Sequence, residues 1–145
     1  MSGWNTRAYC YLGTCGLVGP TIELYPGDSF SLTLVNSLGA NPTGEDTTMN
    51  SMHSPNTTNL HTHGLHIDPA IDTIFTKLAP GTSHTYLYEV PINHAPGLYW
   101  YHDHTHGSSA LKIMGACLYP QVEGYEAAGR LLAPSPLPVV EVEET

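Results

Sequence analysis

The strongest constraint on the fold of this chain is the way its apolar residues alternate with polar ones over short segments. Phe30, Leu32 and Leu34 alternate with small polar residues, and residues 84–90 follow a similar pattern. Side chains of a β-strand point alternately to opposite faces, so such a segment buries one face against a core. The 14 glycines and 12 prolines interrupt these segments, and no stretch keeps a helical period. We therefore predict an all-β protein.

The spacing of the segments predicts the architecture. Short strands separated by turn residues favour a Greek-key β-sandwich or barrel. We expect a single domain over residues 1–120, with a long exposed loop at residues 36–59, where apolar residues are rare. The predicted strands cover residues 21–25, 29–35, 59–67, 84–90, 98–104 and 110–119.

The end of the chain has a different composition. Residues 121–145 include Pro134, Pro136 and Pro138, which prevent regular structure around them, so we predict a Pro-rich tail or linker. Residues 139–142 could begin another strand, and both a truncated element and a tail packed on the domain remain open.

The charge balance narrows the range of partners. The chain has four Lys and Arg residues against 13 Asp and Glu residues, for a net charge of -9. Proteins that bind nucleic acid need a basic surface to neutralise phosphates, so we expect no nucleic-acid partner. No apolar run is long enough to span a bilayer, and we expect no membrane partner.

Histidines form the main candidate site. Six of the nine histidines fall into two clusters. Residues two apart on a strand share a face, so each His-x-His pair places two imidazoles side by side, and we predict that the pairs bind metal. We expect His53, His84 and His94 to be ordinary surface or core residues. The predicted metal ligands are His61, His63, His66, His102, His104 and His106.

Cysteines and ligand type leave two questions open. Cys10 and Cys15 bracket a turn and could form a disulfide or remain two thiols, while Cys117 lies in an apolar run and is expected to be a buried thiol. Imidazole ligands suit zinc, copper, iron and nickel alike. Residue types alone therefore do not choose the metal.

Several motifs resemble those of the first domain of multicopper oxidases, the laccase-like enzymes. The resemblance implies a cupredoxin-type fold and copper as the cofactor. It matches His61 to a ligand of the type 2 copper, His63 and His102 to ligands of one type 3 copper, and His104 to a ligand of the other. Asp72 resembles an acid that passes protons toward bound dioxygen, with Asp68 as a rival. The motifs are Gly19-Pro20-Thr21-Ile22, Pro26-Gly27-Asp28, Asn59-Leu60-His61-Thr62-His63-Gly64, Pro80-Gly81 and Gly97-Leu98-Tyr99-Trp100-Tyr101-His102-Asp103-His104.

Departures from the family limit the expected activity. No cysteine has a neighbouring histidine, so the blue copper motif is missing, as are the later histidine motifs that complete the copper cluster. We expect no oxidase activity from an isolated monomer and predict a homo-oligomer with copper near the interface, which could react with dioxygen. In a monomer, His66 and His106 could instead fill the coordination positions that a second chain would otherwise provide.

Other interpretations stay open at this stage. The chain could be a fragment or partner of a larger oxidase, a copper-binding module without catalysis, or a protein with a cupin-like or zinc site. Relatives in the resembled family are often exported, but residues 1–11 lack the features of a secretory signal, so the cellular location is undetermined.

Overall fold

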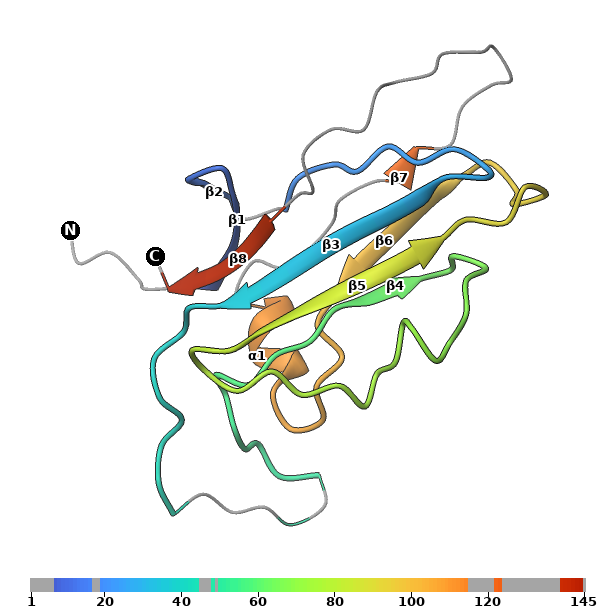
Figure 1. Ribbon diagram of the computed structural model, residues 1–145. Helices are drawn as coiled ribbons and strands as arrows, with labels where there is room; N and C mark the ends of the chain where they lie inside the picture. Colours follow the sequence, from blue (N-terminus) through green and yellow to red (C-terminus); the bar gives the residue numbers. More distant parts are fainter. Residues whose placement is uncertain are drawn as a thin grey trace.

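The computed structural model describes residues 7–16, 19–44, 48, 50–114, 122–123 and 139–144. These residues are mostly strand and loop with one short helix, which confirms the predicted all-β class (Figure 1). Within them, no helix has the length and apolar character needed to cross a membrane. The elements are β1 (Arg7–Tyr11), β2 (Thr14–Gly16), β3 (Ser29–Asn36), β4 (His61–His63), β5 (Ser83–Glu89), β6 (Leu98–His102), α1 (Ser109–Met114), β7 (Val122–Glu123) and β8 (Val139–Glu144).

The described strands form two sheets. One sheet has the order β2-β1-β8-β3-β5, and the other has the order β4-β6-β7. In the larger sheet β3 and β5 run antiparallel over their whole length, side by side in Figure 1. The smaller sheet pairs β4 antiparallel with β6, which brings the two histidine segments together.

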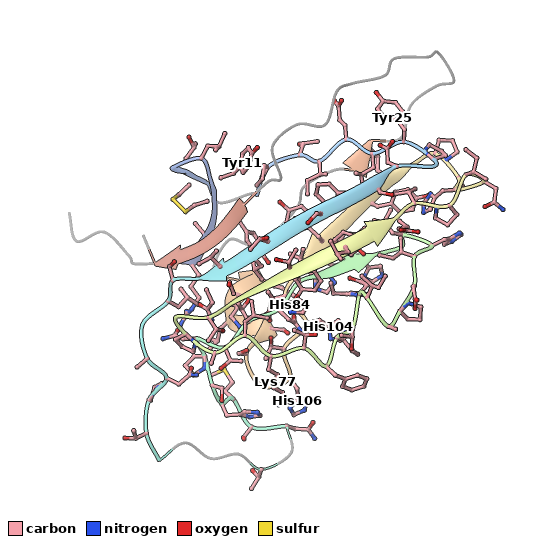
Figure 2. All side chains as sticks on the ribbon, viewed as in Figure 1. Tyr11, Tyr25, Lys77, His84, His104 and His106 are labelled. Atoms are coloured by element: carbon pink, nitrogen blue, oxygen red, sulfur yellow. A yellow bond between two sulfur atoms is a disulfide. The ribbon has the colours of Figure 1, made fainter. Side chains whose placement is uncertain are left out.

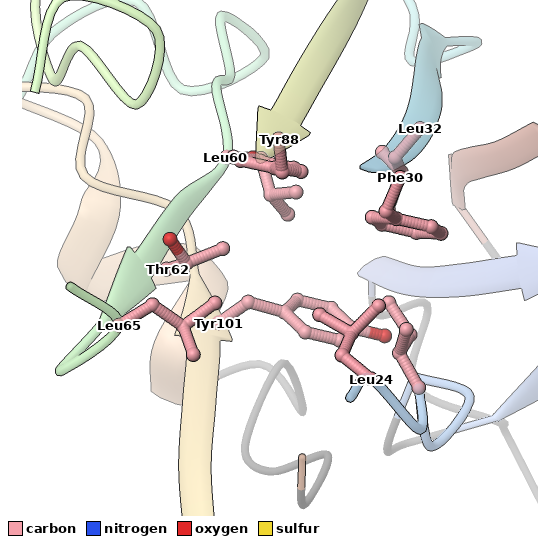
Figure 3. Close-up of a pocket in the computed structure, with 9 residues that line it drawn as sticks. Leu24, Phe30, Leu32, Leu60, Thr62, Leu65, Tyr88 and Tyr101 are labelled. Carbon is pink, nitrogen blue, oxygen red and sulfur yellow. The ribbon is translucent and has the colours of Figure 1, made fainter. Parts of the chain in front are cut away.

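Alternation along β3 and β5 builds the core. Leu32 and Leu34 of β3 are buried, and Leu32 pairs across the sheet with buried Tyr86 of β5. Figure 3 shows a small pocket between the sheets, where Phe30 and Leu32 approach Tyr101 of β6. Its lining is almost wholly apolar, so this pocket is a packing gap in the core.

The N-terminal hairpin resolves one open question. Cys10 of β1 and Cys15 of β2 are directly opposed in the hairpin and form a disulfide. Neither sulfur is therefore available as a thiolate. Cys117 lies outside the described residues.

Two predicted strands are wrong. Residues 21–25 have no regular structure, and the strand expected at residues 110–119 is replaced over its first part by α1; residues 115–119 lie outside the described residues. In this helix Lys112 is buried and reaches the buried Asp103. A short apolar run can belong to either a helix or a strand, and periodicity alone does not distinguish them.

The loop at residues 36–59 is less exposed than predicted. Apart from Asn36, the last residue of β3, its described part contains no strand, but Asn36, Thr58 and Asn59 are fully buried. The side-chain amide of Asn36 donates hydrogen bonds to the carbonyls of Asn56 and Leu78. Polar side chains can be buried when they are satisfied in this way, which composition alone does not reveal.

The predicted tail is described only in part. Residues 124–138 lie outside the described residues, whereas Val139–Glu144 form β8. This strand pairs antiparallel with β1 and parallel with β3, so it lies inside the larger sheet.

Candidate metal centre

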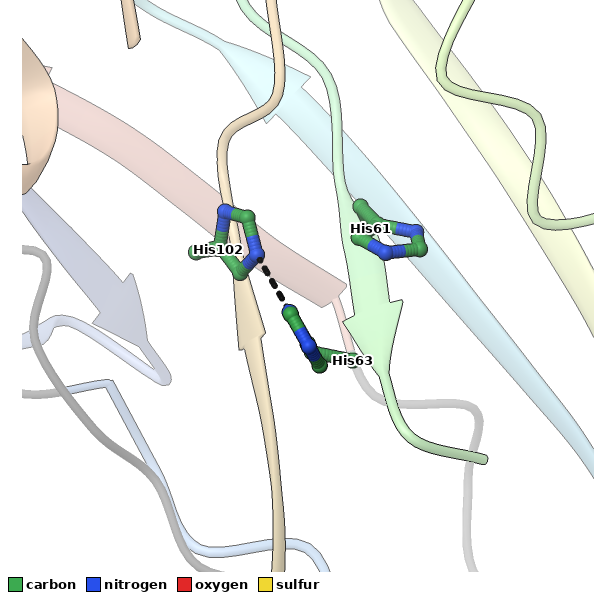
Figure 4. Close-up of side chains that lie close together, drawn as sticks. All are labelled: His61, His63 and His102. Atoms are coloured by element: carbon green, nitrogen blue, oxygen red, sulfur yellow. Dashed lines mark hydrogen bonds between the residues drawn. The ribbon is translucent and has the colours of Figure 1, made fainter. Parts of the chain in front are cut away.

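Strand pairing brings the two His-x-His pairs onto one surface. His61 lies directly opposite His102, and His63 lies opposite Trp100. Because Gly64 adopts a positive φ of 95°, a conformation that favours glycine, the chain turns away immediately after His63. The imidazoles of β4 and β6 therefore lie together at this edge, as Figure 4 shows for His61, His63 and His102.

The four imidazoles form a compact group. The ring centroid of His61 lies 5.4 Å from that of His102 and 5.3 Å from that of His104. The centroid of His102 lies 5.7 Å from those of both His63 and His104. One ring nitrogen from each of His61, His63 and His102 lies within 4.8 Å of the others, a spacing that could hold a metal ion. We call His61, His63, His102 and His104 the histidine cluster.

The orientation of His102 is fixed by its own backbone. Its Nδ1 donates a hydrogen bond to the carbonyl of Asp103 at 2.7 Å, which leaves the Nε2 lone pair available. This Nε2 accepts a hydrogen bond from Nδ1 of His63 at 3.4 Å, a contact between two cluster members that a shared metal ion would replace. Burial is the largest cause that lowers the pKa of His102, and the nearby imidazoles lower it further. The hydrogen bond to the Asp103 carbonyl raises this pKa but does not outweigh them. A lowered pKa favours the neutral ring, the form that binds metal.

Asp72 lies against the cluster. Its Oδ2 is 2.8 Å from Nδ1 of His61, although the angle does not make a well-aligned hydrogen bond. The carboxylate also accepts the backbone N–H of Thr62, and its burial keeps it in place. A carboxylate at one ring nitrogen directs the other nitrogen toward a metal. The rival Asp68 is exposed and bonds to the N–H of Ala70 instead.

Trp100 contacts two members of the histidine cluster. Its ring stacks on His63 with centroids 4.8 Å apart and on His102 with centroids 4.1 Å apart. These ring contacts restrict how either imidazole can rotate. The sequence identified Trp100 only as part of a family motif and missed this role.

A buried polar network around Asp103 holds the segment that carries His102 and His104. Asp103 is fully buried and accepts hydrogen bonds from the Thr58 hydroxyl and the Asn59 backbone N–H. The Asn59 side chain in turn accepts the backbone N–H of His104 at 2.7 Å. Lys112 completes the network with an ion pair to Asp103. Sequence analysis missed these residues, although a carboxylate between two histidines on a strand must point away from them and into the protein.

The remaining histidines lie outside the cluster. Exposed His66 donates its backbone N–H to Nε2 of His94, whose Nδ1 donates to the Ala95 carbonyl. His94 is thus a hydrogen-bonded core residue, as expected, with neither nitrogen available. The structure does not bring His106 into the cluster either; its ring lies 5.5 Å from that of His53.

The donor set fits copper. All four donors are imidazoles, and the contacts around His102 and His61 leave one nitrogen of each ring available. Copper and zinc both accept such ligands. His63 and His104 are exposed, so the histidine cluster is open on one side.

Comparisons with known proteins identify the family and the fold of the chain. A family model described as multicopper oxidase matches residues 14–121. A solved multicopper oxidase from Campylobacter jejuni, described as a metallo-oxidase, matches with a TM-score of 0.54 and 18% identity, over 96% of this chain and 24% of that protein. The chain thus spans about a quarter of that protein's length, and the likeness shows a shared all-β, cupredoxin-like fold. A comparison with curated proteins found no match. Because the family model covers more than half of the chain, the protein belongs to the multicopper oxidase family.

Proposed function

We propose that this chain binds copper through His61, His63, His102 and His104 and forms half of an oxidase-like copper centre. The observation that carries the proposal is the convergence of ring nitrogens from β4 and β6 at spacings within 4.8 Å. Family membership favours copper over the other metals that accept imidazole. Bound copper would supply one-electron redox chemistry toward dioxygen.

The residues of this chain would bind and orient the metal. His102 presents Nε2 because Nδ1 is held by the Asp103 carbonyl, and His61 presents Nε2 because Nδ1 faces Asp72. Asp72 is the buried carboxylate positioned to hold a proton beside the site. We therefore assign Asp72, rather than Asp68, the role of proton carrier at His61.

We further propose that a second copy of the chain completes the site. The exposed His63 and His104 leave the cluster open on one side, and the cluster contains four of the chain's nine histidines. Identical chains commonly assemble with closed symmetry, which sets equivalent half-sites against each other. A homo-oligomer would thereby form a centre that reacts with dioxygen.

Two other functions share the same residues. A copper-binding module without catalysis needs only the histidine cluster, whereas a zinc or cupin-like site needs a different metal. The match to the multicopper oxidase family model favours copper over a zinc or cupin-like site, and the exposed His63 and His104 favour a centre completed by a partner over an isolated copper-binding module.

Metal analysis with EPR of protein loaded under controlled copper tests the ligand assignment. Replacing His63 and His102 together by Ala should abolish most of the bound copper, whereas replacing exposed His84 by Ala should not. Unchanged copper stoichiometry in the double variant would contradict the assignment, and preferential loading with zinc would favour the zinc alternative.

Sedimentation of copper-loaded and metal-free protein tests the assembly. We expect an oligomer when copper is bound, with the His63 and His102 double variant shifted toward monomer. A monomer in both states, with full copper occupancy in the copper-loaded protein, would mean that each chain completes its own site and would contradict the assembly.

A further inference from the structure

A second pair of imidazoles lies apart from the histidine cluster. The ring of His106 lies 5.5 Å from that of His53, with a tilt of 44° between the planes. This separation falls in the range of 5.3 to 5.8 Å found between contacting rings of the histidine cluster. His106 is exposed, and in Figure 2 it lies below His104 toward the lower end of the view.

The ring of His53 is held in a defined orientation. Its Nδ1 donates to the carbonyl of Ser51 at 3.1 Å, so the lone pair lies on Nε2. The structure thus repeats at His53 what it has at His102: one ring nitrogen is held by a backbone carbonyl and the other is left able to bind a metal. Metal-binding histidines commonly have such a supporting hydrogen bond at the nitrogen that does not bind the metal. Among the described residues, no side chain forms a hydrogen bond with Nε2 of His53.

The absence of a side chain at Gly107 leaves the space that the His53 ring fills. A Cβ added at Gly107 would lie 2.4 to 2.6 Å from Cε1, Nδ1 and Nε2 of His53, too close for any other residue without displacing the imidazole. The backbone N–H of His53 also donates to the carbonyl of Gly107 at 3.0 Å. Two distant segments are therefore joined at the point where His53 and His106 meet.

We propose that His53 and His106 form a second copper site that binds Cu(I). Two imidazoles cannot satisfy zinc, which takes four ligands in structural sites and three protein ligands in catalytic ones. Cu(I) accepts low coordination numbers and also binds thioethers, and the residue before His53 is Met52, whose side chain is 67% exposed. The site goes beyond the proposed function, because it uses none of the histidine-cluster ligands.

Anaerobic titration of the full chain with Cu(I) against a coloured Cu(I) chelator tests the site. We expect His53→Ala/His106→Ala to bind one equivalent less than the unmodified protein. His84→Ala, which changes an exposed histidine elsewhere, should bind the same amount as the unmodified protein. Because His106 is exposed, His106→Ala alone keeps the test valid if replacing His53 disturbs folding.

Two further measurements separate this site from the rest. The His63→Ala/His102→Ala variant should retain the Cu(I) equivalent, so failure of the histidine cluster to bind copper would leave this result intact. A parallel titration with Zn(II) should show no difference between the unmodified protein and the His53 and His106 variant. Equal Cu(I) stoichiometry in those two proteins, or a loss of zinc instead of Cu(I), would overturn the proposal.

Discussion

Lys112 lies with its ammonium nitrogen 3.2 Å from Oδ1 of Asp103, and both side chains are almost completely buried. The same ammonium donates to the Thr57 carbonyl and to the Ser108 hydroxyl. Since Asp103 lies between His102, the last residue of β6, and His104, this ion pair ties α1 to the segment that carries half of the histidine cluster. Separating the two buried charges is costly, because water cannot solvate either of them in the interior.

Lys112→Met should therefore destabilise the protein strongly. The substitution leaves an uncompensated carboxylate in the interior, and breaking such a pair costs about 3–5 kcal/mol. Chemical denaturation would measure the loss, with Lys77→Met as the control because Lys77 is exposed. Equal unfolding free energies for the two variants would show that the buried pair adds nothing to stability.

Asp72→Asn should weaken copper binding while Asp68→Asn should not. The amide keeps an acceptor for the Thr62 N–H but removes the negative charge 2.8 Å from Nδ1 of His61. Loss of such a supporting group typically lowers metal affinity by about 10–100-fold. Competition with a copper chelator measures the copper affinity of each variant. An equal loss of affinity in both variants would contradict the assignment of Asp72, rather than Asp68, to the site.

Copper-loaded protein should show no intense blue colour. That colour requires a thiolate bonded to copper beside histidine ligands, and Cys10 and Cys15 are joined in a disulfide. Visible absorption spectra of the copper-loaded protein would be measured before and after Cys117→Ser. A strong band toward the red end of the spectrum that disappears in this variant would contradict the expectation.

Alkaline pH should destabilise the fold through Tyr86. Burial, as the largest cause, raises the pKa of Tyr86 from 10.0 to about 12, against a hydrogen bond from the Leu60 N–H. Between these values the unfolded chain loses the phenolic proton and the folded chain keeps it, so stability is full below pH 10.0 and falls as the pH rises toward 12. The slope from this one group is at most about 1.4 kcal/mol per pH unit.

Tyr86→Phe provides the test. The variant should be less stable at neutral pH by about 1–3 kcal/mol, because the Leu60 N–H loses its acceptor. It should also lose stability less steeply above pH 10, with a remaining slope from Tyr88, whose pKa is raised by burial as well. Denaturation curves at several alkaline pH values would reveal the change, and identical slopes for both proteins would contradict the assignment.

The features that could be predicted from the sequence are those that local backbone geometry determines. The alternation along β3 and β5 identified the strands that form the core, and the spacing of each His-x-His pair placed its two imidazoles on one face. Both follow from the two-residue period of a strand, which depends only on neighbouring residues. The family resemblance rested on the same short motifs and is confirmed by the matching family model.

The sequence by itself determined the strand class and the pairing of histidines within each motif, because both are properties of a few consecutive residues. Only the tertiary structure decided that His61 lies opposite His102, that Asp72 rather than Asp68 reaches the cluster, and that His106 meets His53. It also places residues 110–114 in a helix from which Lys112 reaches Asp103. Register, loop path and buried ion pairs depend on contacts between residues far apart in the chain, and local patterns carry no information about which of those contacts form.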